Sequence, residues 1–153
     1  MRPRLFESEV VLPRPRPEVF AFFSDAANLQ ELTPAWLHFH LDTPPPIALA
    51  EGALVDYRLR VRGVPVRWRT RIAAWEPPRR FVDEQLRGPY RLWLHEHLFE
   101  DADGGAATRV IDRVRYAVPG GPLGTVVDRL LVRRDVETIF AFRRERLRER
   151  FAG

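Results

Sequence analysis

His95 and His97 are the residues of this chain best suited to chemistry, because they stand two positions apart in an alternating stretch. On a β-strand, that spacing puts both imidazoles on one face. If Asp112 lies beside His95, the pair could be a general base with its orienting carboxylate, a ligand contact, or a buried hydrogen bond that only satisfies two polar groups. His-x-His with Asp83 or Asp112 also suits a metal, but no fourth ligand is evident and we expect no metal.

Composition removes several other kinds of site. The chain has no cysteine, which excludes disulfides, thiolate zinc sites, iron–sulfur clusters and cysteine nucleophiles. Ser8 and Ser24 are the only serines, and neither lies in a nucleophile elbow, which disfavours serine hydrolase chemistry. All 25 basic residues are arginine against 21 acidic residues, so the formal charge is only +4. Without an RNP, helix-turn-helix or zinc-finger signature, we expect no nucleic-acid partner, and we expect no cofactor.

A length of 153 residues favours a single domain over residues 1–153. Near the N-terminus, Glu7, Glu9 and several prolines interrupt any apolar run, so neither a secretory signal nor a membrane span is expected there. We therefore expect a cytoplasmic protein without an integral membrane segment, as a monomer or a homodimer.

The first part of the chain predicts strands and two short helices. Leu5 to Leu12 is rich in Val and bounded by prolines, which is typical of a strand. Helical spacing after Pro17 predicts a short helix, a break near Ser24 and a second short helix that ends before Pro34. The alternation between Trp36 and Asp42 predicts another strand.

The clearest pattern is a hairpin over residues 55–72, where apolar residues alternate with arginine. A two-residue turn at Arg62-Gly63 would join its strands. It would pair Val61 with Val64, Leu59 with Val66, Tyr57 with Trp68 and Val55 with Thr70. Both apolar sets then share one side of the sheet. The opposite side carries Arg58, Arg60, Arg62, Arg67, Arg69 and Arg71.

Three further strands are predicted, from Arg80 to Leu86, from Tyr90 to Glu100 and from Thr108 to Val118. A turn centred near Asp103-Gly104 would pair Phe99 with Thr108, His97 with Val110, His95 with Asp112 and Trp93 with Val114. Arginines on the other face of the last strand must point outward, so these paired residues point inward. A wider turn around Gly88 puts Phe81, Asp83 and Gln85 on the same inward face.

Apolar residues between Leu123 and Phe151 recur at spacings near three, four and seven, which predicts a helix about 40 Å long. The polar run Arg133 to Asp135 indicates a bend or a change of buried face. The charged tail from Arg143 to Arg150 is expected to be a solvated helix end, with a membrane-surface or RNA-binding helix as alternatives. Only this helix can cover the apolar face of the sheet. The fold class is therefore α+β: a curved antiparallel sheet of about seven strands around a long C-terminal helix, with two short helices after strand one.

The inward face is too polar for a dry core, since an unpaired buried polar group costs about 1–3 kcal/mol. We therefore expect a partly hydrated pocket with aromatic walls between the sheet and the helix. Its predicted residues are Tyr57, Trp68, Thr70, Phe81, Asp83, Gln85, Trp93, His95, His97, Asp112, Tyr116, Ile139 and Phe140.

Two runs of the sequence carry a family resemblance. They are residues 12–25 with Asn28-Leu29, Leu32-Thr33-Pro34 and Trp36, and residues 81–85 with Gly88-Pro89-Tyr90, Trp93, His95, His97, Phe99, Thr108, Asp112, Val114, Tyr116 and Pro119-Gly120. The chain resembles the SRPBCC (START-like, helix-grip) superfamily, and the second run resembles its bacterial single-domain branch of ligand-binding or polyketide cyclase/dehydrase-like proteins. The resemblance implies a seven-stranded sheet gripping the C-terminal helix around a hydrophobic tunnel. Relatives bind lipids, sterols, polyketides, plant hormones or protein clients, so it implies no one reaction.

The leading hypothesis is binding of a small, mostly hydrophobic molecule, aromatic, polycyclic or lipid-like, between the sheet and the C-terminal helix. The aromatic residues would form walls, and the Asp and His residues would orient a hydroxyl or carbonyl. The alternative is a polyketide cyclase, aromatase or dehydratase that transfers protons at His95 with Asp112 behind it. A third hypothesis is an interaction module whose Arg-rich face or charged helix end meets an acidic partner.

Overall fold

The computed structural model describes residues 2–152, so Met1 and Gly153, at the ends of the predicted domain, lie outside the described residues. The strands are β1 (Arg4–Leu12), β2 (His40–Leu41), β3 (Leu54–Val61), β4 (Val64–Glu76), β5 (Arg80–Arg87), β6 (Leu92–Ala102) and β7 (Ala107–Ala117). The α-helices are α1 (Arg16–Phe23), α2 (Gly121–Val127) and α3 (Arg133–Arg150). Short helical turns are η1 (Ala26–Gln30), η2 (Ala35–Leu37), η3 (Asp103–Gly105) and the π-helical segment η4 (Asp128–Val132).

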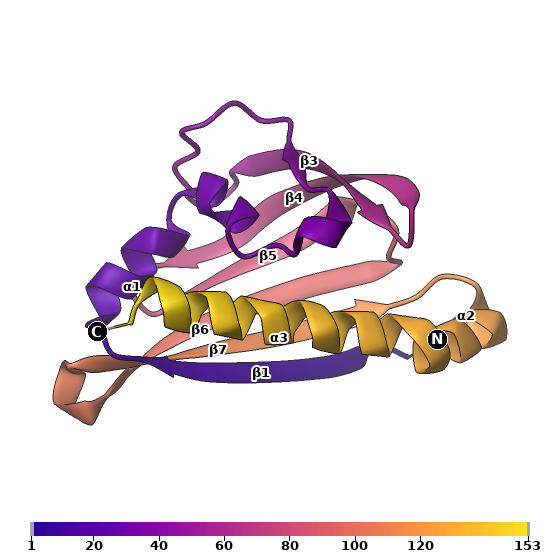
Figure 1. Ribbon diagram of the computed structural model, residues 1–153. Coiled ribbons are helices and arrows are strands. Elements are labelled where there is room, and N and C mark those ends of the chain that lie inside the picture. The colour runs from indigo at the N-terminus through magenta and orange to yellow at the C-terminus, as the bar shows by residue number, and fades with distance from the viewer. Residues whose placement is uncertain (1, 153) are drawn as a thin grey trace.

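The described residues form one sheet of seven strands in the order β1-β7-β6-β5-β4-β3-β2, and every neighbouring pair is antiparallel. Figure 1 shows α3 lying across the sheet near β1, β6 and β7, while α1 and the turns that follow it arch over the β3–β5 side. The predicted fold class is confirmed. An antiparallel sheet with one apolar face is stable only when another element covers that face, and here α3 does so.

The β3–β4 hairpin is confirmed in the predicted register, with Val61 opposite Val64 and Tyr57 opposite Trp68. Gly63 lies at φ 81° and Arg62 at φ 50°. Two left-handed residues in succession are what a two-residue turn matched to the sheet twist requires. The alternation of apolar and Arg residues therefore predicts this part of the sheet because one face is buried and one is exposed.

The predicted register between β6 and β7 is wrong by two residues. His97 lies opposite Asp112 and His95 opposite Val114, because the strands pair as far as Ala102 and Ala107 and η3 forms the connection. The side-chain period of a strand is two, so this slip leaves each predicted inward residue on the inward face.

The strand predicted between Trp36 and Asp42 is wrong for most of its length. Residues Ala35–Leu37 form the 3₁₀ turn η2, and only His40–Leu41 pairs with the sheet. His38 ends the turn in the left-handed region at φ 49°, which breaks the extended backbone that alternation would need. The segment arches over the sheet as a cover.

The long C-terminal helix is confirmed, and η4 provides the change of geometry expected near Arg133. The fully solvated helix end is wrong at two positions, because Arg143 is 6% exposed and Leu147 is 0% exposed. Residues 136, 140, 143 and 147 recur at spacings of four and three, so they form the buried stripe of α3. Within residues 2–152, no helix combines the length and apolarity needed to cross a bilayer.

Candidate functional site

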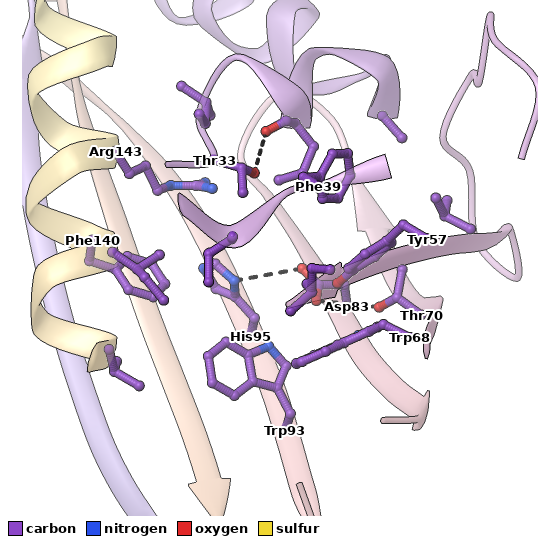
Figure 2. Close-up of a pocket in the computed structure, with 18 of the residues that line it drawn as sticks. Thr33, Phe39, Tyr57, Trp68, Thr70, Asp83, Trp93, His95, Phe140 and Arg143 are labelled. Carbon is purple, nitrogen blue, oxygen red and sulfur yellow. Dashed lines mark hydrogen bonds and ion pairs between the residues drawn. The ribbon is translucent and has the colours of Figure 1, made fainter. Parts of the chain in front are cut away.

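A cavity of about 640 Å³ lies between the concave face of the sheet, α3 and the covering segment of residues 26–39. A volume of this size matches small-molecule sites, which are concave and mostly apolar with a few polar groups. Ten of the predicted pocket residues line it: Tyr57, Trp68, Thr70, Phe81, Asp83, Trp93, His95, His97, Ile139 and Phe140. Figure 2 shows Trp68, Trp93 and Tyr57 on the sheet side and Phe140 and Arg143 reaching in from the helix.

Gln85 and Tyr116 are placed outside the cavity lining. The amide of Gln85 donates to the carbonyl of Tyr90 at 2.7 Å and accepts from its N–H at 3.1 Å, so it fastens the β5–β6 loop. Tyr116 is fully buried, and its hydroxyl donates to Asp128 at 2.8 Å. Burial, together with this hydrogen bond, raises the pKa of Tyr116 to about 12. Both side chains position structure around the cavity.

Asp112 also lies outside the lining, directly behind His95. Its Oδ1 is 2.7 Å from Nε2 of His95, and both side chains are buried. Burial by itself would raise the pKa of Asp112, but the Arg143 charge and the hydrogen bond from His95 outweigh it and hold this pKa well below its usual range. Asp112 is therefore a carboxylate that fixes the orientation of the His95 ring.

The hydrogen bonds of His97 determine its tautomer. Arg143 Nη2 is 3.3 Å from Nδ1 of His97, and a guanidinium only donates, so Nδ1 must accept. The ring proton is then on Nε2, which donates to Asp83 Oδ2 at 2.5 Å. Burial and the neighbouring His95 lower the pKa of His97 to about 4. His97 is therefore neutral at neutral pH.

Asp83 is the carboxylate that faces the cavity. Burial favours its neutral form, but the hydrogen bond from His97 and the nearby charges outweigh burial and lower its pKa. Among residues 2–152, its Oδ1 has only a long contact of 3.5 Å with the Thr70 hydroxyl, which also lies 3.1 Å from the Glu84 carbonyl. Figure 2 shows the Asp83 carboxylate between His95 and Thr70. A bound molecule could therefore donate a hydrogen bond to Oδ1.

Arg143 is the site residue that the sequence reading missed. Its Nη2 lies 3.3 Å from Asp112 Oδ1, and its guanidinium lies over the rings of Phe23 and Phe140 at 5.2 and 5.8 Å. Among residues 2–152, nothing accepts a hydrogen bond from its buried Nε. Its burial could have been predicted from helical spacing, because Arg143 lies on the same stripe as Val136, Phe140 and Leu147. Because most residues from 143 to 150 are charged, the whole tail was predicted to be solvated.

Two carboxylates and one guanidinium lie close together at the polar end of the cavity. Asp83 and Asp112 each carry one negative charge, Arg143 carries one positive charge, and the His97 ring is neutral. A buried carboxylate oxygen that lacks a close hydrogen bond is costly, so the polar end favours a hydrogen-bond donor at Asp83. This selects a hydroxyl over a bare carboxylate as the ligand group nearest Asp83.

Aromatic rings form the rest of the wall. Tyr57 and Trp68 are stacked with centroids 5.8 Å apart, and Trp93 meets Trp68 edge-to-face at 5.5 Å. The indole N–H of Trp68 is buried and has no acceptor among residues 2–152. Flat rings and an unused donor favour a planar molecule with an oxygen acceptor.

Asp83, His95 and His97 each place one ligand-type atom within 4.8 Å of the others. The spacing within this group does not favour a metal. Nε2 of His97 carries the proton donated to Asp83, and the 2.5 Å separation of these two atoms is too short for two ligands of one tetrahedral ion. The geometry is that of a hydrogen-bonded cluster.

The covering segment contributes further cavity residues that the sequence reading missed: Leu29, Leu32, Thr33, Trp36, Leu37 and Phe39. Leu29, Trp36 and Leu37 lie in 3₁₀ turns and the other three in irregular chain, so neither the strand period nor the α-helical period could identify them as lining residues. At the other end, Arg62 donates two hydrogen bonds to Asp135, at 2.8 and 3.0 Å, and joins the β3–β4 turn to α3. Both residues line the cavity, so this ion pair spans its edge.

Most of the outer arginines are paired with acids of the same surface. Arg58 pairs with Asp42, Arg69 with Asp56, and Arg71 with Glu84. Arg62, predicted on this face, lies instead at the cavity edge. These pairs offset part of the positive charge of this face, while Arg60 and Arg67 have no acidic partner among residues 2–152.

A family model described as "Polyketide cyclase / dehydrase and lipid transport" matches residues 4–152. No curated protein matches the sequence.

Solved structures share the fold at low sequence identity. Protein CV1439 from Chromobacterium violaceum is similar with a TM-score of 0.73 and 12% identity, covering 97% of each chain. Norcoclaurine synthase from Thalictrum flavum gives 0.71 and 11%, covering 96% of this chain and 92% of that chain. The Zhui aromatase/cyclase from a Streptomyces species gives 0.67 and 17%, covering 98% of this chain and 97% of that chain. At these identities the likeness shows the fold alone.

Proposed function

This chain belongs to the polyketide cyclase / dehydrase and lipid transport family, and from that membership we propose that it binds a small, mostly hydrophobic, planar molecule in the cavity under α3. The observation that carries the proposal is the combination of stacked aromatic walls with one carboxylate, Asp83, whose Oδ1 is nearly free to accept a hydrogen bond. The aromatic surface supplies affinity, and Asp83 orients a hydroxyl.

Naphthol and its methyl ether, methoxynaphthalene, test this proposal. Both are flat and apolar, but only naphthol donates a hydrogen bond. Titration followed by tryptophan fluorescence should show tighter binding of naphthol, by about tenfold, since a hydrogen bond to a charged group contributes about 1.5–3 kcal/mol. Asp83→Asn should remove most of this difference while the ether binds as before.

A blocking variant locates the site. Ile139 lines the cavity and Ala141 does not, although both lie on α3. Ile139→Trp should abolish naphthol binding by filling space, and Ala141→Trp, at an exposed position, is its matched control. Equal binding by both variants would place naphthol outside the cavity and overturn the proposal.

The second candidate function is proton-transfer catalysis of the cyclase or dehydratase kind. It is favoured by the buried His95–Asp112 hydrogen bond of 2.7 Å, with His95 itself among the lining residues. An imidazole held by a carboxylate and open to a cavity has the geometry of a general base. The test is turnover of an aromatic polyketide-type substrate, with a pH profile that changes in His95→Gln. Binding without turnover leaves the first proposal standing alone.

The cytoplasmic location, the single domain and the monomeric or dimeric state stay predictions. Gel filtration and sedimentation measure the last of these.

A further inference from the structure

An exposed apolar stripe runs along α2 and η4, outside the cavity. Leu123, Val126 and Leu130 are 70%, 51% and 63% exposed. Spacings of three and seven residues put them on one side of a helix. Figure 1 shows α2 at one end of the molecule, extending past the strands. Contiguous apolar side chains at such a tip mark a contact surface, whereas scattered single ones do not.

The opposite side of the same segment is firmly anchored. Asp128 is buried, accepts from the Tyr116 hydroxyl at 2.8 Å and pairs with Arg4 at 3.0 Å. Gly124 is buried against the end of the segment that follows β7, with no room for a Cβ beside the Pro119 carbonyl. The leucines therefore cannot turn inward without breaking these contacts. They stay exposed in the folded protein.

Exposed arginines lie within and directly after this segment. Arg129 and Arg134 are exposed, and Arg91 lies beside the end of β7, where its N–H donates to the Ala117 carbonyl. Among residues 2–152, no carboxylate pairs with any of these three guanidiniums. The acid within the stripe itself, Asp128, is buried and neutralised by Arg4. The segment thus combines exposed apolar side chains with arginines that have no acidic partner among residues 2–152.

We propose that this stripe docks on the surface of a membrane that contains anionic lipids. Leu123, Val126 and Leu130 would enter the boundary between headgroups and acyl chains, and Arg129 and Arg134 would lie at the level of the phosphates. Apolar residues on one side and arginines beside them are the pattern of helices that lie in the membrane interface. Arginine adds attraction to anionic lipid within a Debye length of the surface.

A second copy of the chain fits this surface less well. A two-fold interface would bring the same patch against itself, and with it two copies of each unpaired arginine, which repel one another. The membrane proposal also places the cavity near lipid, because Val132 and Arg134 line the cavity and follow the stripe directly. It is independent of the ligand proposal.

Vesicle sedimentation tests the docking surface. The full chain should bind vesicles of phosphatidylcholine mixed with phosphatidylglycerol, bind pure phosphatidylcholine vesicles weakly, and lose affinity as salt is added. Leu123→Gln with Leu130→Gln should weaken binding by about tenfold or more, since both apolar contacts are lost. Arg129→Gln should reduce the dependence on salt.

Val11→Gln is the matched control, because Val11 is also exposed but lies on β1. It should leave vesicle binding unchanged. Naphthol binding should be the same in the Leu123/Leu130 variant as in the wild type, so failure of docking and failure of ligand binding are separable. The proposal is overturned if neither vesicle binds, if the leucine variant binds as well as the wild type, or if the protein sediments as a dimer that the leucine variant dissociates.

Discussion

Removal of the Arg143 charge should destabilise the fold, because Arg143 and Asp112 form a buried ion pair beside the cavity. Arg143→Met keeps an unbranched apolar stem but leaves buried Asp112 with only the hydrogen bond from His95. Taking one partner from a buried ion pair costs about 3–5 kcal/mol. For a chain of this size each kcal/mol lowers the melting temperature by about 2–4 °C, so the variant should melt roughly 10 °C lower.

The mechanism is tested by a double-mutant cycle measured by urea unfolding at neutral pH. Arg143→Met and Asp112→Asn should each destabilise the fold, and the double variant should be destabilised by about 2 kcal/mol less than the sum of the two single effects, because it removes both charges of the pair. Both Arg143→Met and the double variant lose the contacts of Arg143 with aromatic rings, so the contribution of these contacts cancels from the coupling energy. Additive effects, within about 0.5 kcal/mol, would refute the ion pair as the reason that Arg143 is buried.

Three further predictions concern pH, the cavity edge and packing. The pKa of His97 is about 4 in the folded state and has the usual value of 6.5 in the unfolded chain, so the unfolded chain binds this proton at higher pH. The free energy of unfolding should therefore fall by about 3 kcal/mol as the pH drops from above 6.5 to below 4. His97→Gln should flatten this part of a urea-unfolding pH profile. Arg62→Ala breaks an exposed pair with Asp135, so it should cost less than about 1 kcal/mol yet speed naphthol release in stopped-flow experiments; an unchanged release rate would mean that the pair does not gate the cavity. Gly124→Ala puts a Cβ against the Pro119 carbonyl oxygen and should cost about 1–3 kcal/mol in thermal unfolding, whereas Thr125→Ala, whose hydroxyl makes a long bond within α2, should cost less.

The sheet was predictable where charge separated its two faces. Arginines alternate with apolar residues through residues 55–61 and 64–72, which assigns the two faces, and the two-residue turn at Arg62-Gly63 then fixes the register of the hairpin. On β6 and β7 the same reasoning gave the faces correctly. It could not give the register, because pairing depends on how many residues the connection takes, and a slip of two changes no face.

The site was only partly predictable, for two physical reasons. The covering segment of residues 26–39 contains two short 3₁₀ turns joined by irregular chain. Such short turns give no hydrophobic periodicity from which buried residues could be predicted. Arg143 lies among seven other charged or apolar residues of a tail in which solvation is the ordinary outcome, and its burial depends on Asp112, a residue on another element. The local sequence pattern of one element cannot predict its contact with a residue on an element distant in the sequence.

The most direct test of the central claim is a set of nuclear Overhauser effects between bound naphthol and the indole N–H protons. Of the four tryptophans, Trp36, Trp68 and Trp93 line the cavity, whereas Trp75 packs against the hydrophobic core. We predict cross-peaks from naphthol to Trp68 and Trp93 and none to Trp75. Bound naphthol that shows cross-peaks to neither Trp68 nor Trp93 would contradict the placement of the ligand between the sheet and α3.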